Sequence, residues 1–331
     1  MENVDYSLII PVYNEEETLS ELYKQVSSLI EKLDGEAEVI LVDDGSKDRS
    51  YSLMIDIHNI DPRFKIIRFS KNFGHQIAIT AGMDFAGGKA IIIMDADLQD
   101  PPEVVLEMAA CWREGYDIVY AQRAERQGET FFKKLTAAIF YRLLHKLTQI
   151  DIPVDVGDFR LVDYKALEAF KVLREHNRYV RGMFSWIGFK QIGITYQRSA
   201  RFAGRTKYPF KKMLKLALDG IFSFSNIPLQ LVLKLGMTII VVSLLGFIIL
   251  AILALDRRVI SGLIWLYFFI ALTCGLQLFG MGLIGEYVGR IYEEAKNRPL
   301  YIIKTLHGLE TDKIFMPHYN YQSKHDTTAA G

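Results

Sequence analysis

The chain reads Ala90-Ile-Ile-Ile-Met-Asp95-Ala-Asp97-Leu-Gln-Asp-Pro-Pro102, and in this stretch an apolar run of strand length ends in two carboxylates one residue apart. The run is uncharged and rich in β-branched side chains, which is typical of a strand buried on both faces. The two prolines cannot continue a ladder of backbone hydrogen bonds, and they suit the first turn of a helix. We therefore expect Asp95 and Asp97 at the carboxyl end of a central parallel strand, where open α/β sheets bind ligands.

Asp95 and Asp97 repel each other at that position unless a positive charge joins them. A divalent cation that also binds a diphosphate is the simplest partner, and it predicts a metal site. Gln99 follows at a position where it can touch the same ligand. The alternative is a helix cap with a turn residue, and Asp100 before Pro101 suits such a cap.

Strand-like and helix-like patterns alternate over residues 1–125. This alternation predicts right-handed βαβ units and a doubly wound, mostly parallel sheet. We expect strands over Tyr6–Val12, Glu38–Asp43, Phe64–Phe69, Ala90–Met94 and Asp117–Ala121, with helices over Glu15–Leu33 and after Lys47.

Two loops follow the first two predicted strands, with the sequences Pro11-Val-Tyr-Asn-Glu15 and Val42-Asp-Asp44-Gly-Ser46. In a doubly wound sheet both loops lie at the same edge as Asp95. An Asp-Asp-Gly turn is common as ordinary turn chemistry. Three acidic strand ends in this order indicate a nucleotide-binding crevice.

Two further segments carry paired or clustered charges. In Gly157-Asp158-Phe-Arg160, an acid and a base lie two residues apart, on one face of a strand. A surface ion pair, worth little energy, is the alternative. From Ser199 to Tyr208, bases alternate with a glycine and a hydroxyl residue, which suits a mobile phosphate-binding loop or attraction to anionic lipid headgroups.

Two long uncharged runs, residues 235–255 and 259–285, come later in the chain. At about 1.5 Å per residue each is long enough to cross a bilayer core of about 30 Å, so we expect two transmembrane helices within 231–287. Two buried core helices are the alternative. Lys and Arg dominate the flanking segments, and this predicts that residues 1–230 and the tail 288–331 both lie in the cytoplasm, at the inner (plasma) membrane.

Two segments, residues 130–149 and 209–225, carry apolar side chains at helical spacing with bases interleaved. Basic amphipathic helices near a membrane span lie in the interface, although core-facing helices with a charged outer face give the same pattern. The net charge of +0 gives no reason to expect nucleic acid as a partner.

With these residues in view, the chain resembles glycosyltransferase family 2. More narrowly, it is similar to the polyprenyl-phosphate hexosyltransferases, which include bactoprenol glucosyltransferases and dolichol-phosphate mannose synthases. The resemblance lies in Ile10-Pro-Val-Tyr-Asn-Glu15, Asp43-Asp-Gly-Ser46, Asp95-Ala-Asp97-Leu-Gln99 and the segment from Arg201 to Lys207. It implies a GT-A type α/β fold and an inverting enzyme that uses a nucleotide-sugar donor, a lipid-phosphate acceptor and Mg²⁺ or Mn²⁺.

The resemblance also implies a role for each matching residue. Asp95 and Asp97 would hold the metal on the donor diphosphate, with Gln99 nearby, and Asp158 matches the acid of the catalytic loop, with Arg160 beside it. The nucleotide base and ribose would contact Pro11, Tyr13, Glu15 and Asp44, and the phosphates would contact Arg123, Arg201 and Lys207.

The resemblance to bactoprenol enzymes suggests glucose from UDP-glucose and undecaprenyl phosphate as acceptor, in a homo-oligomeric membrane protein. Mannosyl or aminoarabinosyl transfer is an alternative, as is a non-catalytic module that binds a nucleotide sugar. An acceptor phosphate with a second pKa near ~6 is already mostly ionised at pH 7, so Asp158 need not act as a base.

Overall fold

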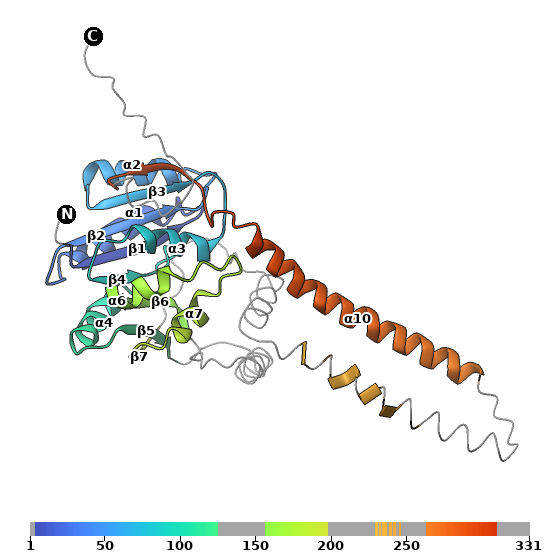
Figure 1. Ribbon diagram of the computed structural model, residues 1–331. Coiled ribbons are helices and arrows are strands. Elements are labelled where there is room, and N and C mark those ends of the chain that lie inside the picture. The colour runs from blue at the N-terminus through green and yellow to red at the C-terminus, as the bar shows by residue number, and fades with distance from the viewer. Residues whose placement is uncertain are drawn as a thin grey trace, which may run out of the picture.

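The computed structural model describes residues 4–124, 156–197, some residues between 229 and 245, and 263–309. The two predicted interfacial helices, over 130–149 and 209–225, lie outside the described residues, and so do Arg201 and Lys207. Within the described part, a layered α/β body carries one long helix that projects away from it (Figure 1).

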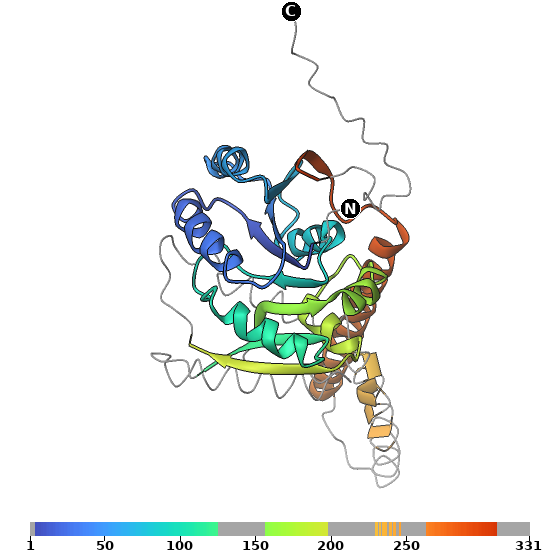
Figure 2. The same cartoon turned by 90° about the vertical axis from the view of Figure 1, so that its left-hand side faces the viewer.

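One eight-stranded sheet forms the centre of this body, in the order β7-β5-β6-β4-β1-β2-β3-β8. Figure 2 shows this order, with β7 at one end and β8 at the other. The strands are β1 (Tyr6–Val12), β2 (Ala37–Asp43), β3 (Phe64–Phe69), β4 (Ala90–Ile93), β5 (Ile118–Arg123), β6 (Val156–Asp163), β7 (Gln191–Tyr196) and β8 (Ile303–His307).

The prediction of a doubly wound, mostly parallel sheet is confirmed. Strands β4, β1, β2 and β3 run parallel to one another, and β7 is parallel to β5. Strand β6 is inserted antiparallel between β4 and β5, and β8 is antiparallel to β3. The sheet is therefore mixed, and the inserted strand β6 becomes important at the site.

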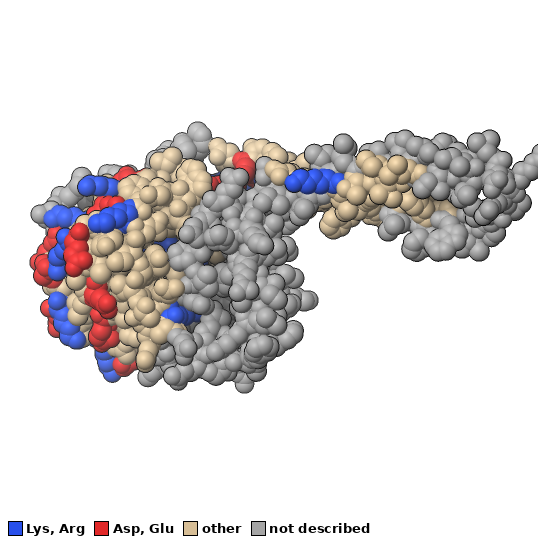
Figure 3. Space-filling view, turned by 90° about the horizontal axis from the view of Figure 1, so that it is seen from below, with Lys and Arg blue, Asp and Glu red and all other residues tan. Residues whose placement is uncertain are grey.

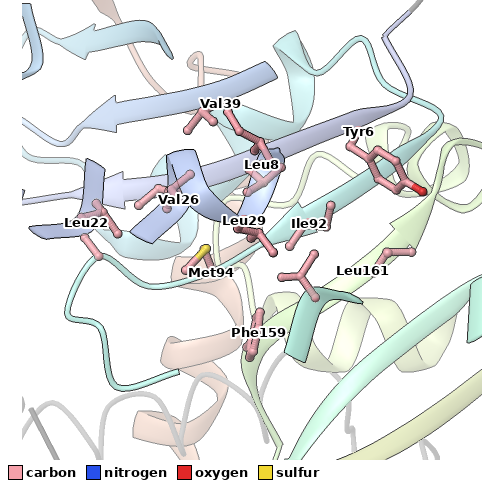
Figure 4. Packing of buried hydrophobic residues seen from close by; sticks show 14 of the residues in the cluster. Tyr6, Leu8, Leu22, Val26, Leu29, Val39, Ile92, Met94, Phe159 and Leu161 are labelled. Atoms are coloured by element: carbon pink, nitrogen blue, oxygen red, sulfur yellow. The ribbon is translucent and has the colours of Figure 1, made fainter. Parts of the chain in front are cut away.

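Helices cover both faces of the sheet, as the uninterrupted apolar strands require. Alternate side chains of one strand enter different cores: Leu8 and Ile10 join the first cluster, and Ile9 joins the second. Figure 4 shows part of the first cluster. Helices α1 (Leu19–Ile30), α2 (Ser50–Ile60) and α4 (Val104–Arg113) supply the first cluster, and α3 (His75–Phe85), α6 (Tyr164–Lys171) and α7 (Val180–Trp186) supply the second.

The segment after residue 262 begins with α10 (Leu263–Ala295) and ends in the sheet. His176 holds the end of α10 in place. Its backbone N–H donates to the Glu294 carboxylate, and its ring Nδ1 lies within hydrogen-bonding distance of the same group. Its Nε2 lies 2.7 Å from the Arg298 carbonyl oxygen. The Tyr301 hydroxyl then donates to buried Asp84, and β8 pairs with β3. Part of the predicted tail 288–331 thus belongs to the α/β body.

Large apolar side chains are exposed along α10, among them Leu278, Phe279, Met281 and Ile291. The described surface of this projection is mostly uncharged in Figure 3. No helix among the described residues combines the length and apolarity needed to cross a membrane. The prediction of two membrane-spanning helices is therefore not confirmed; most of the first predicted span lies outside the described residues.

Helix α3 lies against β1 at a point where only glycine fits. A Cβ atom at Gly82 would lie 2.2 Å from Cγ2 of Ile9. This close approach fixes the height of α3 above the sheet, and with it the position of His75 at the start of the helix.

We expect Gly82→Ala to lower the free energy of unfolding by roughly 1–3 kcal/mol, because the added methyl group overpacks the contact with Ile9. In an Ile9→Ala background the same change should cost little, since the clashing atom is gone. Urea denaturation of the four proteins measures this coupling. Equal costs in both backgrounds would contradict the assigned contact.

Candidate active site

The carboxyl edge of the parallel strands gathers the predicted residues, and β6 adds to them from the opposite direction. Because Ile93 pairs with Arg160 in an antiparallel register, the start of β6 lies beside the end of β4. Continuing this register by two residues places Asp158 next to Asp95. The predicted metal-binding acid and the predicted catalytic acid are thus neighbours through sheet pairing, although 63 positions separate them in the chain (158 − 95).

His75, the first residue of α3, lies between these two acids. Its Nε2 is 3.4 Å from Oδ1 of Asp95 and 3.3 Å from Oδ2 of Asp158. Burial lowers the pKa of His75, but the hydrogen bond to Asp158 and the charge of Asp95 outweigh burial and raise it to about 9. A protonated imidazole therefore joins the two carboxylates at neutral pH.

Asp158 is almost fully buried, and both of its oxygens are engaged. Arg181 of α7 binds it through two hydrogen bonds, Nε to Oδ1 at 2.9 Å and Nη2 to Oδ2 at 3.1 Å, and Gln76 donates to Oδ2 at 3.3 Å. Burial alone would raise the pKa of Asp158, but the charge of Arg181 and the bond from His75 prevail and hold it well below its usual value. Asp158 is therefore ionised at neutral pH, and it is a weak base.

Asp95 is only partly covered and lies in a strongly negative environment. Burial raises its pKa to about 6; His75 opposes this rise, and the charges of Asp100, Asp158 and Asp97 add to it. Asp97 also accepts a hydrogen bond from the backbone N–H of Gln99, which shapes the loop between β4 and α4.

The acids fit a hard divalent cation. Mg²⁺ and Mn²⁺ prefer oxygen ligands, and Mg²⁺ in particular is commonly held by one or two carboxylates together with substrate phosphates. Asp95 and Asp97 supply two such carboxylates, and their mutual repulsion favours a cation. Within the described residues, no group of three or more His, Cys, Asp and Glu side chains is placed to hold a metal ion.

The loops after β1 and β2 are fastened to each other beside this cluster. Asn14 adopts a left-handed backbone with φ of 53°; its N–H donates to the Ser46 hydroxyl, and its side-chain oxygen accepts from the Lys47 N–H. Pro11 is buried within β1, and Tyr13 and Glu15 flank Asn14 on this loop. The structure therefore brings the predicted nucleotide-binding residues to the same edge as the acids.

Asp44 is buried, and its carboxylate organises the loop that leads into α3. It accepts hydrogen bonds from the backbone N–H groups of Phe73 and Gly74 and from the Asn72 side chain. Burial raises the pKa of Asp44 to about 6 despite these donors. Asp44 thus connects the second strand to the loop before His75.

The predicted basic residues differ in their surroundings. Arg160 is buried beneath Asp158, where its Nη2 donates to the Gly157 carbonyl oxygen and its guanidinium lies 4.7 Å from the centre of the Phe184 ring. Burial lowers the pKa of Arg160 to about 10. Arg123 lies at the end of β5 beside Gly157, where a Cβ atom would approach its Nη2 to 3.2 Å.

Sequence reasoning missed His75, Gln76 and Arg181. His75 and Gln76 lie in the segment that follows β3, just after Asn72-Phe-Gly74. This segment is polar, like those after β1, β2 and β4. The expectation that carboxyl ends of parallel strands meet at one edge could therefore have found both residues. Arg181 comes from α7, a short helix with no distinct sequence signal, and its contact with Asp158 depends on tertiary packing.

The comparisons with known proteins identify this fold and its acidic strand ends as those of a glycosyltransferase. Residues 7–170 match the model of "Glycosyl transferase family 2". The chain is 51% identical over 95% of its length to the glycosyltransferase YkcC of Bacillus subtilis, with 97% of that protein covered. It is 40% identical over 91% of its length to a prophage-derived bactoprenol glucosyl transferase of Shigella flexneri, with 98% of that protein covered. The chain belongs to glycosyltransferase family 2.

We expect Asp158→Asn to lower kcat on the order of a hundredfold, because Arg181 and His75 lose their common partner and shift. The residual activity should not rise in proportion to hydroxide from pH 6 to 9, since a carboxyl with a strongly lowered pKa takes no proton there. Asp163→Asn on the same strand is the control. Recovery of Asp158→Asn in proportion to hydroxide would instead indicate base catalysis.

Asp44 should give the fold a measurable pH dependence. Because its pKa is raised to about 6 from 3.8, the folded chain binds an extra proton between about pH 4 and 6, and stability is lost as pH rises through this range. Asp44→Asn removes this loss, so the Tm of the variant relative to wild type should rise from pH 4 to 7. A constant difference in Tm would contradict the raised pKa.

Proposed function

We propose that this glycosyltransferase moves glucose from UDP-glucose to undecaprenyl phosphate with inversion at the anomeric carbon. The observation that carries the proposal is the cluster of Asp95, Asp158, His75 and Arg181 at the carboxyl edge of the sheet, with Asp97 near enough to Asp95 for the two charges to interact. The similarity to bactoprenol glucosyl transferases along nearly the whole chain supports the sugar and the acceptor.

The reaction is a direct displacement. An oxygen of the acceptor phosphate forms a bond to the anomeric carbon as the bond from that carbon to the donor diphosphate breaks. The nucleoside diphosphate leaves with the electron pair. A Mg²⁺ or Mn²⁺ ion held by Asp95 and Asp97 would supply positive charge to the diphosphate.

Asp158 acts in this scheme by position and charge. An acceptor phosphate with a second pKa near ~6 needs no base at pH 7. The buried carboxylate holds Arg181 and His75 in fixed places and presents negative charge near the sugar, whose ring gains positive charge in the transition state. Arg123, Arg201 and Lys207 remain predicted phosphate contacts.

The acceptor requires a site at a lipid surface. We propose that the exposed apolar side chains of α10 contact lipid and hold the α/β body at the cytoplasmic face of the plasma membrane. The attachment of α10 to the body through His176, Glu294 and Tyr301 would fix the distance between that surface and the acids.

Labelled sugar transfer tests the proposal. Purified protein with UDP-[¹⁴C]glucose and undecaprenyl phosphate should move label into the organic phase, and EDTA should abolish the transfer. Asp97→Ala should lower the rate by at least about a hundredfold, because the charge of the leaving group is no longer neutralised. Asp56→Ala, at an exposed position of α2, is the control and should retain full activity.

The same assay separates the alternatives. Label that enters lipid only from mannosyl or aminoarabinosyl donors would replace glucose in the proposal. Metal-dependent donor binding without turnover on any of these donors would indicate a nucleotide-sugar-binding module. Full transfer by Asp97→Ala in the presence of EDTA would contradict the metal site itself.

A further inference from the structure

The loop that carries Asp95 and Asp97 has an unusual backbone. Leu98 adopts φ of 57°, in the left-handed region that branched side chains rarely enter. Its side chain is buried in the first core cluster, and this packing holds the backbone in that conformation. Backbone strain next to a functional residue persists only where the surroundings overdetermine it.

Tyr196, the last residue of β7, supplies that restraint. Its hydroxyl donates a hydrogen bond to Oδ1 of Asp100, and both residues are buried, with exposed fractions of 6% and 2%. Asp100 lies two residues after Leu98 and directly before Pro101 and Pro102. The hydrogen bond therefore fixes the far end of the loop whose near end is β4.

Tyr196 also contacts two other parts of the site. Its ring packs edge-to-face on Phe159, with centroids 5.9 Å apart, and Phe159 lies between Asp158 and Arg160 on β6. Figure 4 shows Phe159 near Met94, the residue before Asp95. Tyr196 pairs in register with Arg123, and its hydroxyl accepts a hydrogen bond from the Arg123 guanidinium. One side chain thus connects the metal-binding loop, the strand of Asp158 and a predicted phosphate contact.

We propose that Tyr196 is a positioning residue that holds the Asp95–Asp100 loop in the geometry that binds a divalent cation together with the donor diphosphate. This inference rests on the proposed function of Asp95 and Asp97. Tyr196 lies behind the loop, in the core, and acts through Asp100.

The test measures binding of UDP to the full chain in detergent, by calorimetry, with Mn²⁺ and with EDTA. The Mn²⁺-supported gain in UDP affinity should fall roughly tenfold in Tyr196→Phe, which keeps the ring and loses the hydrogen bond to Asp100 together with the contact to Arg123. UDP affinity in EDTA, which reports any shift of Arg123, should fall by much less than the affinity in Mn²⁺. A general loss of packing would weaken both.

Tyr301→Phe is a matched control, because the Tyr301 hydroxyl is also buried and also donates to a carboxylate, Asp84, remote from the loop. Tyr301→Phe should lower the free energy of unfolding about as much as Tyr196→Phe does, and it should keep the increase in UDP affinity that Mn²⁺ produces. Asp100→Asn keeps an acceptor for Tyr196 and should retain most of the gain, whereas Asp100→Ala should lose it, with no further loss in the double variant with Tyr196→Phe.

Two results would overturn the inference while leaving the proposed function intact. In the first, Mn²⁺ increases the UDP affinity of Tyr196→Phe as much as it does that of the wild type. In the second, Tyr301→Phe loses as much of this increase as Tyr196→Phe does. If the wild-type chain bound UDP equally well with Mn²⁺ and with EDTA, the proposed function would be overturned, and this inference with it.

Discussion

Crowding of negative charge at one edge of the sheet is the constraint on which this structure depends. Asp95, Asp97, Asp100 and Asp158 all lie near the end of β4, where burial makes each charge more costly than it is in water. Within the described residues, the chain offsets part of this charge with His75 and Arg181. The two carboxylates are compensated unequally. Arg181 and His75 hold the pKa of Asp158 well below its usual value, whereas the pKa of Asp95 stays raised. In the proposed function, a divalent cation would supply the remaining positive charge and would also attract the diphosphate of the donor.

The fold creates this crowding through one reversed strand. In a wholly parallel sheet, the start of a strand lies at the opposite edge from the ends of its neighbours. Because β6 runs antiparallel to β4, its first residues come to the ligand-binding edge, and Asp158 approaches Asp95. Helix α7 then places Arg181 against Asp158, and the Gly82 contact sets the height of α3 and so of His75.

The sequence predicts well what short-range patterns encode. The expected strands over 6–12 and 64–69 agree with β1 and β3 residue for residue, because both segments are short and mostly apolar and both are buried along most of their length. The sharing of one strand face by Asp158 and Arg160 is also local, and β6 confirms it. The direction of β6 has no local signal, and neither does the partnership of Arg181 with Asp158. The position of Tyr196 behind the loop likewise depends on β7 pairing with β5, which only the folded chain shows.

A crystal structure of the full chain with UDP and Mn²⁺, with manganese located by its anomalous scattering, tests directly whether Asp95 and Asp97 hold the cation. We expect one manganese peak in contact with carboxylate oxygens of Asp95 and Asp97 and with oxygens of the UDP diphosphate, while Asp158 remains paired with Arg181. A diphosphate bound away from these acids, or manganese held without them, would contradict this expectation.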